Sequence, residues 1–211
     1  GLGTDGFKEA WLARGLPYYY KYRFIQEVYP QKTWVPFQNR FTDWLFGFDR
    51  FDYGYQNRFL FLFLQRQGLD QAQGTRVDSL SRLNYEAILQ AKTYLNISHL
   101  RAYIGEKDFK RSLSRFLNQG AESDFSSAKD LQASLNYYSP KPTDSYFSSS
   151  VNSAEINDYQ LLEYNHCPTV STATVRNSGH LSTPYSITGF KDGKAVLTQW
   201  YEGHEGKSYV V

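Results

Sequence analysis

The hydrophobic residues of the first two thirds of the chain recur at three- and four-residue spacings, which is the pattern of amphipathic helices. The first predicted helix covers about residues 7–28, with Thr4 or Asp5 as its N-cap. Gly15 and Pro17 lie in the middle of this segment, so we expect a distorted or interrupted helix.

An aromatic-rich stretch over residues 31–67 contains an alternating run of phenylalanine and leucine at residues 59–64. On its length alone, this run fits a buried strand. Its polar flanks favour a buried helix that ends with Gly68 at the C′ position. A polar loop is expected over residues 69–81.

Three further helices are predicted before the composition changes. Residues 84–104 carry the most regular apolar face of the chain, and Gly105 is placed to end that helix. Residues 107–117 form a second amphipathic segment. A third helix is expected to start near Asp124 as N-cap and to continue to about Leu135.

From Ile156 onward the apolar residues alternate with period two, which predicts short strands. Asp192-Gly193 between two β-rich runs predicts a hairpin with a type I′ turn. About five short strands in so short a segment indicate a small antiparallel β-sandwich. The predicted class is therefore α+β, with a helical unit over residues 1–135, a linker or irregular segment over 136–155 and a β-sandwich over 156–211.

Composition and charge exclude several classes of function. Of the 211 residues, 41% are hydrophobic and 18% are aromatic, which argues against disorder. A net charge of +2 gives no electrostatic reason to expect nucleic acid or an anionic membrane as a partner. No apolar stretch is long enough to span a bilayer. Cys167 is the single cysteine, so an internal disulfide and a cysteine-based zinc cluster are excluded, and the compartment stays open.

Three segments, taken in order, resemble the M1 family of zinc aminopeptidases. The first, W-L-A-R-G-L-P-Y-Y at residues 11–19, is similar to the W-L-x-E-G-x-x-x-Y helix that follows the family's HExxH helix and supplies its third zinc ligand. The second, residues 88–105, is similar to the family's Y-E-K-G-x-x-x-L-x-x-L-x-x-x-L-G segment. The third runs from Phe109 to Tyr159. Residues 176–194 look like the small C-terminal β module of some bacterial M1-like proteins.

This resemblance implies a particular fold and a particular partner. The helical unit would be an all-α, M1-peptidase-like (gluzincin) subdomain from the C-terminal half of the catalytic domain, followed by the β module. The chain contains no methionine and starts with glycine, so we expect a fragment whose partner is the missing N-terminal half of the same domain. In such a domain Trp11, Tyr18, Tyr19 and Gln90 would line the substrate cleft.

The departures from the family concern its catalytic residues. HExxH is absent, and no two of the four histidines are four residues apart. The position of the glutamate zinc ligand is held by Arg14, whose guanidinium has no lone pair to donate to a metal. The position of the transition-state tyrosine is held by Gln90, whose amide can still donate to an oxyanion. We therefore assign no catalytic residue and no metal ligand, and we expect zinc only in the intact parent.

Several functions remain open from the sequence. We expect a non-catalytic fragment of an M1-aminopeptidase-like protein, a pseudoenzyme that binds a peptide or protein partner or acts as a scaffold. Alternatively, the parent is an active zinc-dependent aminopeptidase whose HExxH motif lies upstream of this chain. A purely structural module is the third possibility, and in that case Arg14 and Gln90 are ordinary polar positions on helices.

Overall fold

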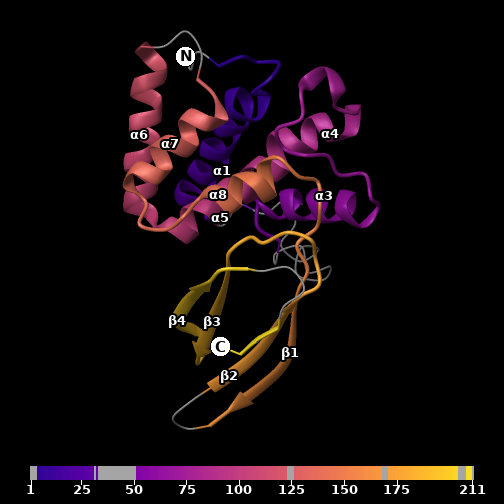
Figure 1. The fold of residues 1–211 in the computed structure, drawn as a ribbon, viewed down its shortest axis with the longest axis vertical. Helices are drawn as coiled ribbons and strands as arrows, with labels where there is room; N and C mark the ends of the chain where they lie inside the picture. Colours follow the sequence, from indigo (N-terminus) through magenta and orange to yellow (C-terminus); the bar gives the residue numbers. More distant parts are fainter. Residues whose placement is uncertain are drawn as a thin grey trace. The chain divides into compact units, whose positions relative to one another are not determined.

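The computed structural model describes residues 4–30, 32, 51–122, 126–167, 171–203 and 208–210. The chain divides into two compact units, Gly1–Pro142 and Thr143–Val211. The first unit is helical, and the second contains the described strands together with two short helical segments (Figure 1). The predicted α+β class is therefore confirmed.

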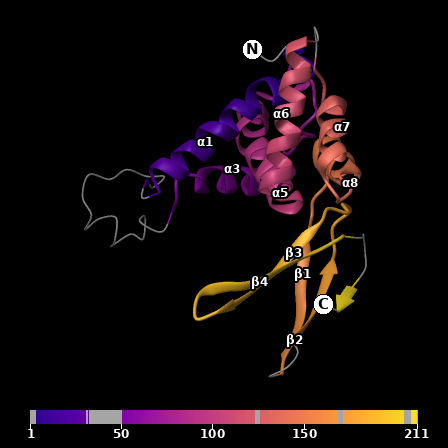
Figure 2. The same ribbon diagram turned by 90° about the vertical axis from the view of Figure 1, so that its left-hand side faces the viewer.

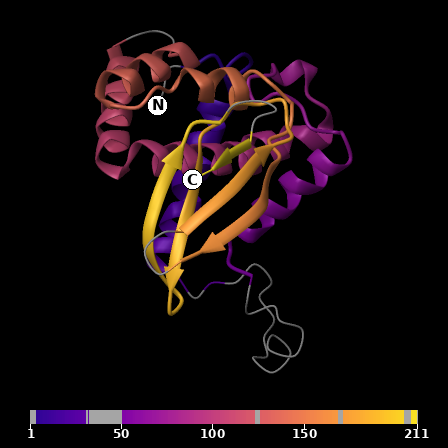
Figure 3. The same cartoon turned by 60° about the horizontal axis from the view of Figure 1, so that its bottom comes forward.

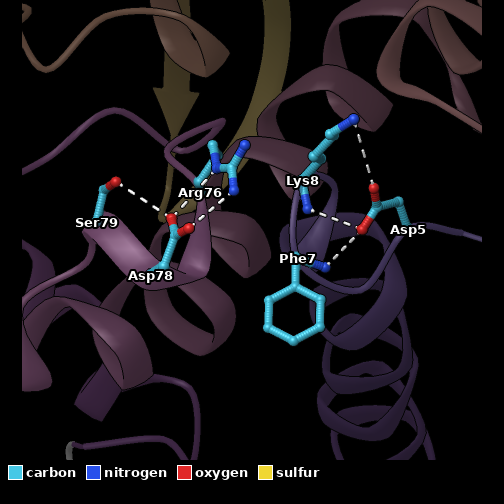
Figure 4. A network of polar contacts seen from close by, with 6 residues as sticks. All are labelled: Asp5, Phe7, Lys8, Arg76, Asp78 and Ser79. Carbon is cyan, nitrogen blue, oxygen red and sulfur yellow. Dashed lines mark hydrogen bonds and ion pairs between the residues drawn. The ribbon is translucent and has the colours of Figure 1, made fainter.

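The first helix is distorted where the sequence predicts it. A π-helical turn, η1 (Trp11–Gly15), leads directly into α1 (Leu16–Val28). Pro17 lies in the first turn of α1 and has no backbone N–H to donate, so regular α-helical bonding cannot run through this point. The N-cap of this helix is Ala10, which makes no side-chain cap bond, so the prediction of Thr4 or Asp5 is wrong. The carboxylate of Asp5 instead stabilises a turn before the helix, where it accepts hydrogen bonds from the backbone N–H groups of Phe7 and Lys8 at 2.9 and 3.2 Å (Figure 4).

The expected polar loop over residues 69–81 contains one turn of 3-10 helix, η3 (Val77–Ser79). Its backbone is tied to the N-terminal segment, because the N–H of Val77 donates to the carbonyl of Phe7 at 3.0 Å. Beside this bond, Asp78 accepts from Arg76 at 2.8 Å and from the Ser79 hydroxyl at 3.2 Å (Figure 4).

Helix α3 (Tyr55–Arg66) confirms the helical interpretation of the phenylalanine and leucine run. Gly68 follows it with φ of +64°, as expected of a C′ glycine. The helix is not buried all round, because Leu64 is 1% exposed whereas Phe59 and Phe63 are 55% and 45% exposed. Residues 33–50 of the aromatic-rich stretch lie outside the described residues.

The predicted helix over residues 84–104 is confirmed, with a π-helical turn inside it. It consists of α4 (Arg82–Glu86), η4 (Ala87–Lys92) and α5 (Thr93–Ile104). Gly105 ends the helix with φ of +94°. Along this length the apolar face is buried, and it forms the centre of the helical unit together with residues of α1 (Figure 2).

Helices α6 (Glu106–Glu122) and α7 (Ala128–Tyr138) pack side by side (Figures 1 and 2). The N-cap of α7 is Ser127, so the prediction of Asp124 is wrong. The reason is a reciprocal capping box: the hydroxyl of Ser127 accepts from the N–H of Asp130 at 3.4 Å, and the carboxylate of Asp130 accepts from the N–H of Ser127 at 2.8 Å. Residues 123–125 lie outside the described residues.

Substituting Ser127 with alanine is expected to lower the free energy of unfolding by about 1 kcal/mol. The reason is that the backbone N–H of Asp130 loses its acceptor, and the reciprocal capping box is broken. Urea denaturation followed by circular dichroism measures this loss. Ser148, an exposed serine outside any cap whose hydroxyl donates one exposed bond to the carbonyl of Ser145 at 3.2 Å, provides the control, and Ser148→Ala should change the midpoint less. Equal effects of the two substitutions would contradict the assignment of the cap.

The core of the helical unit is built from large side chains of five helices. Tyr19 of α1 contacts Tyr94 of α5 and Phe109 of α6, with ring centroids 6.3 and 6.1 Å apart. The largest side chains below 2% exposure in this unit are Trp11, Tyr19, Leu12, Leu64, Ile88, Ile97, Leu100, Phe109, Phe116, Leu131 and Leu135. None of the helices in the described ranges is long and apolar enough to cross a membrane.

The second unit begins with the short segments α8 (Asp144–Tyr146) and η5 (Phe147–Val151). Five strands follow, as predicted: β1 (Tyr159–His166), β2 (Ser171–Asn177), β3 (Tyr185–Lys191), β4 (Lys194–Tyr201) and β5 (Ser208–Val210) (Figure 3). They form two antiparallel sheets, one in the order β1-β2-β5 and one of β3-β4.

The turn between β3 and β4 confirms the type I′ prediction, since Asp192 and Gly193 have φ of +51° and +74°. An aromatic contact joins the two sheets: the ring centroids of Tyr159 and Tyr185 are 4.6 Å apart. Farther along β4 the side chains are exposed, with Leu197 at 62%. Sandwich-like packing is thus concentrated near Tyr159 and Tyr185.

Candidate functional site

The two π-helical turns of the helical unit pack against each other. The contact is close because Gly15 of η1 lies against Thr93, the residue that follows η4. A Cβ atom on Gly15 would be 2.6 Å from Cγ2 and 2.8 Å from Oγ1 of Thr93. Only glycine allows this approach. We call this place the η1–η4 junction.

Thr93 stabilises η4 from its C-terminal end. Its side chain is fully buried, and its hydroxyl donates to the carbonyl of Ile88 at 2.8 Å. The backbone N–H of Thr93 donates to the same carbonyl, which is the i→i−5 bond of a π-helix. Single π-helical turns occur frequently at functional sites. The η1–η4 junction is therefore a candidate functional site.

Arg14 and Gln90, the two residues that replace catalytic groups in the resemblance, both lie on these π turns. Arg14 is exposed on η1, and its Cζ atom is 5.6 Å from the ring centroid of Tyr85. Gln90 is half-buried on η4, five residues after Tyr85. Neither side chain forms a hydrogen bond or ion pair with another described residue, so their donor groups are available to a ligand.

The other predicted cleft residues differ in their exposure. Tyr18 is half-buried, and Lys21 lies over its ring with Nζ 5.6 Å from the centroid. Trp11 and Tyr19 are each 1% exposed, and their side chains pack within the helical core. Of the predicted set, Tyr18 and Gln90 are the ones that offer surface to a ligand in this structure.

Tyr19 adds no ionisable group to the junction at neutral pH. Burial raises the pKa of its hydroxyl, and the nearby guanidinium groups of Arg101 and Arg23 oppose this shift only in part. The hydroxyl therefore stays protonated.

A buried ion pair joins Lys92, the last residue of η4, to Asp70. The ammonium of Lys92 donates to the carboxylate of Asp70 at 2.8 Å and to the carbonyl of Gln71 at 2.7 Å. The two charged side chains are 5% and 6% exposed. Burial lowers the pKa of Lys92, and the charge of Asp70 opposes that shift. This pair anchors the loop after α3 to the π turn that carries Gln90.

The residues of the junction do not fit a zinc ion. Zinc in proteins takes imidazole, thiolate or carboxylate ligands. The functional groups of Arg14, Gln90, Tyr18 and Tyr85 are a guanidinium, an amide and two phenols, none of which belongs to that set. Within the described ranges, no three side chains of His, Cys, Asp or Glu lie close enough together to hold a metal ion.

Several residues of the junction could not be singled out from sequence. Lys92 is buried, but its partner Asp70 lies 22 residues earlier and no local pattern connects the two. The roles of Thr93 and Tyr85 at the junction could not be predicted either, because a hydrophobic period of 3.6 residues does not reveal where a π-helical turn lies. No family model matches the chain, and no curated protein matches it.

Proposed function

We propose that this chain is part of an M1-aminopeptidase-like protein that has lost zinc chemistry and binds a peptide or protein segment at the η1–η4 junction. One observation carries this proposal. The two positions that the resemblance assigns to a zinc ligand and to a transition-state tyrosine lie on two π-helical turns in direct contact. Arg14 and Gln90 at these positions have free hydrogen-bond donors but no capacity to ligate zinc.

The chemistry of the junction suits backbone recognition. A peptide exposes carbonyl oxygens and, at its C-terminus, a carboxylate, and both accept hydrogen bonds from a guanidinium or an amide. Tyr85 provides aromatic surface beside the guanidinium of Arg14, and Tyr18 follows Arg14 by four residues along the chain. Arg14 brings a positive charge to the place where the family has a carboxylate, so the proposal favours an anionic or carbonyl-rich ligand over a cation.

The test combines metal analysis, hydrolysis and binding on the purified chain. We expect no stoichiometric zinc after dialysis and no metal-dependent hydrolysis of amino-acyl anilides. Fluorescent tetrapeptides with a free C-terminus should bind, and Arg14→Ala and Gln90→Ala should each weaken binding by about threefold to tenfold. Arg82→Ala, an exposed arginine on α4, is the matched control.

Stoichiometric zinc or metal-dependent hydrolysis would overturn the proposal in favour of an active zinc aminopeptidase. Equal binding by the wild type and the Arg14 and Gln90 variants would also overturn it, because the junction would then have no part in recognition. Circular dichroism of each variant shows whether the helical unit is still folded.

A further inference from the structure

Away from the η1–η4 junction, helices α6 and α7 enclose a surface groove of about 560 Å³. This volume lies within the range of ligand-binding pockets. The groove is lined on the α6 side by Lys110, Arg111 and Arg115 and by the amides of Asn118 and Gln119, and α7 contributes Tyr138. The two helices lie side by side in Figures 1 and 2.

The lining carries three cations and no carboxylate. Arg111 and Arg115 form no ion pair with a carboxylate of the described residues. Lys110 pairs with the carboxylate of Glu106 at 3.0 Å. The same carboxylate also pairs with Arg23 at 2.6 Å and with Arg101 at 3.4 Å. Arg111 and Arg115 therefore bring positive charge to the groove that no ion pair with a described residue compensates.

The placement of these cations opposes helix stability. Arg111 and Arg115 are four residues apart on α6, where like charges repel each other. Lys107, exposed one turn before Arg111, adds a second pair of the same kind. An anion bound in the groove between Arg111 and Arg115 would relieve the repulsion between these two residues.

Arg115 is held in place by an exposed aromatic ring. Its Cζ atom is 4.0 Å from the ring centroid of Tyr137, a residue that is 64% exposed. A guanidinium stacked on a ring keeps its in-plane N–H donors free for a carboxylate. The stack fixes the direction of those donors before a ligand arrives, which lowers the entropy cost of binding.

We propose that the α6–α7 groove binds an extended acidic peptide segment whose carboxylates are two residues apart. Four residues of an α-helix rise by about 6 Å, which is the axial separation of Arg111 and Arg115. In an extended peptide, side chains two residues apart lie on one side and are separated by about 6.6 Å. Two such carboxylates can therefore meet the two guanidinium groups at once.

The groove is less suited to single-stranded nucleic acid. Binding of that kind relies on open aromatic faces on which bases stack. The guanidinium of Arg115 already lies over the ring of Tyr137, and Tyr138 makes an edge contact with the same ring at 4.8 Å between centroids.

The experiment measures fluorescence anisotropy of labelled pentapeptides with the full chain. One peptide has glutamates at its second and fourth positions and serines elsewhere, and another has its two glutamates adjacent. We expect the first to bind more tightly, and the affinity to fall as salt rises from about 50 mM to about 300 mM. The double substitution Arg111→Gln and Arg115→Gln should weaken binding at least about tenfold. Arg82→Gln on α4 changes the net charge at a distant exposed site and should have no effect.

Three results would overturn the proposal. In the first, the double variant binds as tightly as the wild type. In the second, Arg82→Gln, which removes one charge, weakens binding by half or more of the free-energy loss of the double variant, which removes two. Tighter binding of a pentathymidylate than of the acidic peptide would assign the groove to nucleic acid. Arg14 and Gln90 do not line this groove, so Arg14→Ala and Gln90→Ala should leave the binding of the acidic peptide unchanged. The two proposals can therefore fail independently.

Discussion

Substituting Lys92 with alanine is expected to destabilise the helical unit by about 3–5 kcal/mol. Its ammonium and the Asp70 carboxylate are almost fully buried and 2.8 Å apart, so the substitution leaves a carboxylate in the interior without its cation. The carbonyl of Gln71 loses its donor as well. Urea denaturation at neutral pH measures the loss as a lower midpoint with an unchanged slope.

Two comparisons make this prediction specific to the buried pair. The double substitution Lys92→Met with Asp70→Leu removes both charges and should be clearly less destabilising than Lys92→Ala. Arg76→Ala breaks an exposed ion pair with Asp78, whose side chains are more than half exposed, and should leave the stability nearly unchanged. If Lys92→Ala were as mild as Arg76→Ala, the ion pair would not be buried in solution.

The second large effect is expected at Gly15. A methyl group there would overlap the fully buried side chain of Thr93, and the backbones of η1 and α5 must move apart to admit it. We expect Gly15→Ala to lower the free energy of unfolding by about 1–3 kcal/mol, the usual range for overpacking. Thermal and urea unfolding measure it.

A double-mutant cycle tests whether the overlap with Thr93 is the cause. Thr93→Ser removes the Cγ2 atom nearest to the new methyl group and keeps the hydroxyl that donates to Ile88. The combined variant should therefore lose less stability than the sum of the single variants. Gly6→Ala is the control, because a Cβ at Gly6 has open space around it. Strict additivity would mean that Gly15 and Thr93 do not meet.

The helices were predictable from sequence because their apolar residues follow one face over two or more turns. Residues 84–104 show this best, since their predicted end at Gly105 is also where the backbone turns to positive φ. The type I′ turn at Asp192-Gly193 was predictable for a local reason too, because few other residue pairs tolerate positive φ at both positions.

The errors come from competition between nearby signals. The start of α7 was assigned to Asp124, although Ser127 with Asp130 three residues later is a capping-box pattern, and the reciprocal bonds of that box are what the structure has. The alternation at residues 59–64 gives α3 apolar side chains all round, and a pattern without a polar face does not reveal which side is buried.

For the candidate site, sequence could point to Arg14 and Gln90 but not to what holds them. Their positions follow from a resemblance between segments, whereas the contact between η1 and η4 depends on Gly15 and Thr93, 78 residues apart by their numbers. The Lys92–Asp70 pair is similarly non-local. The α6–α7 groove needs the pairing of two helices, and the basic residues of α6 alone would be taken for a solvated face.

The π-helical turns also have a consequence for how this chain can change in length. Each such turn accommodates one residue more than an α-helix needs over the same path, so the helices on either side stay in phase. Deleting one residue within η4, which has no proline after it, would return a regular α-helix and keep both flanks packed, but would remove the position now held by Gln90. Relatives of this chain should therefore be sought with single-residue gaps allowed inside helices, where alignments usually forbid them.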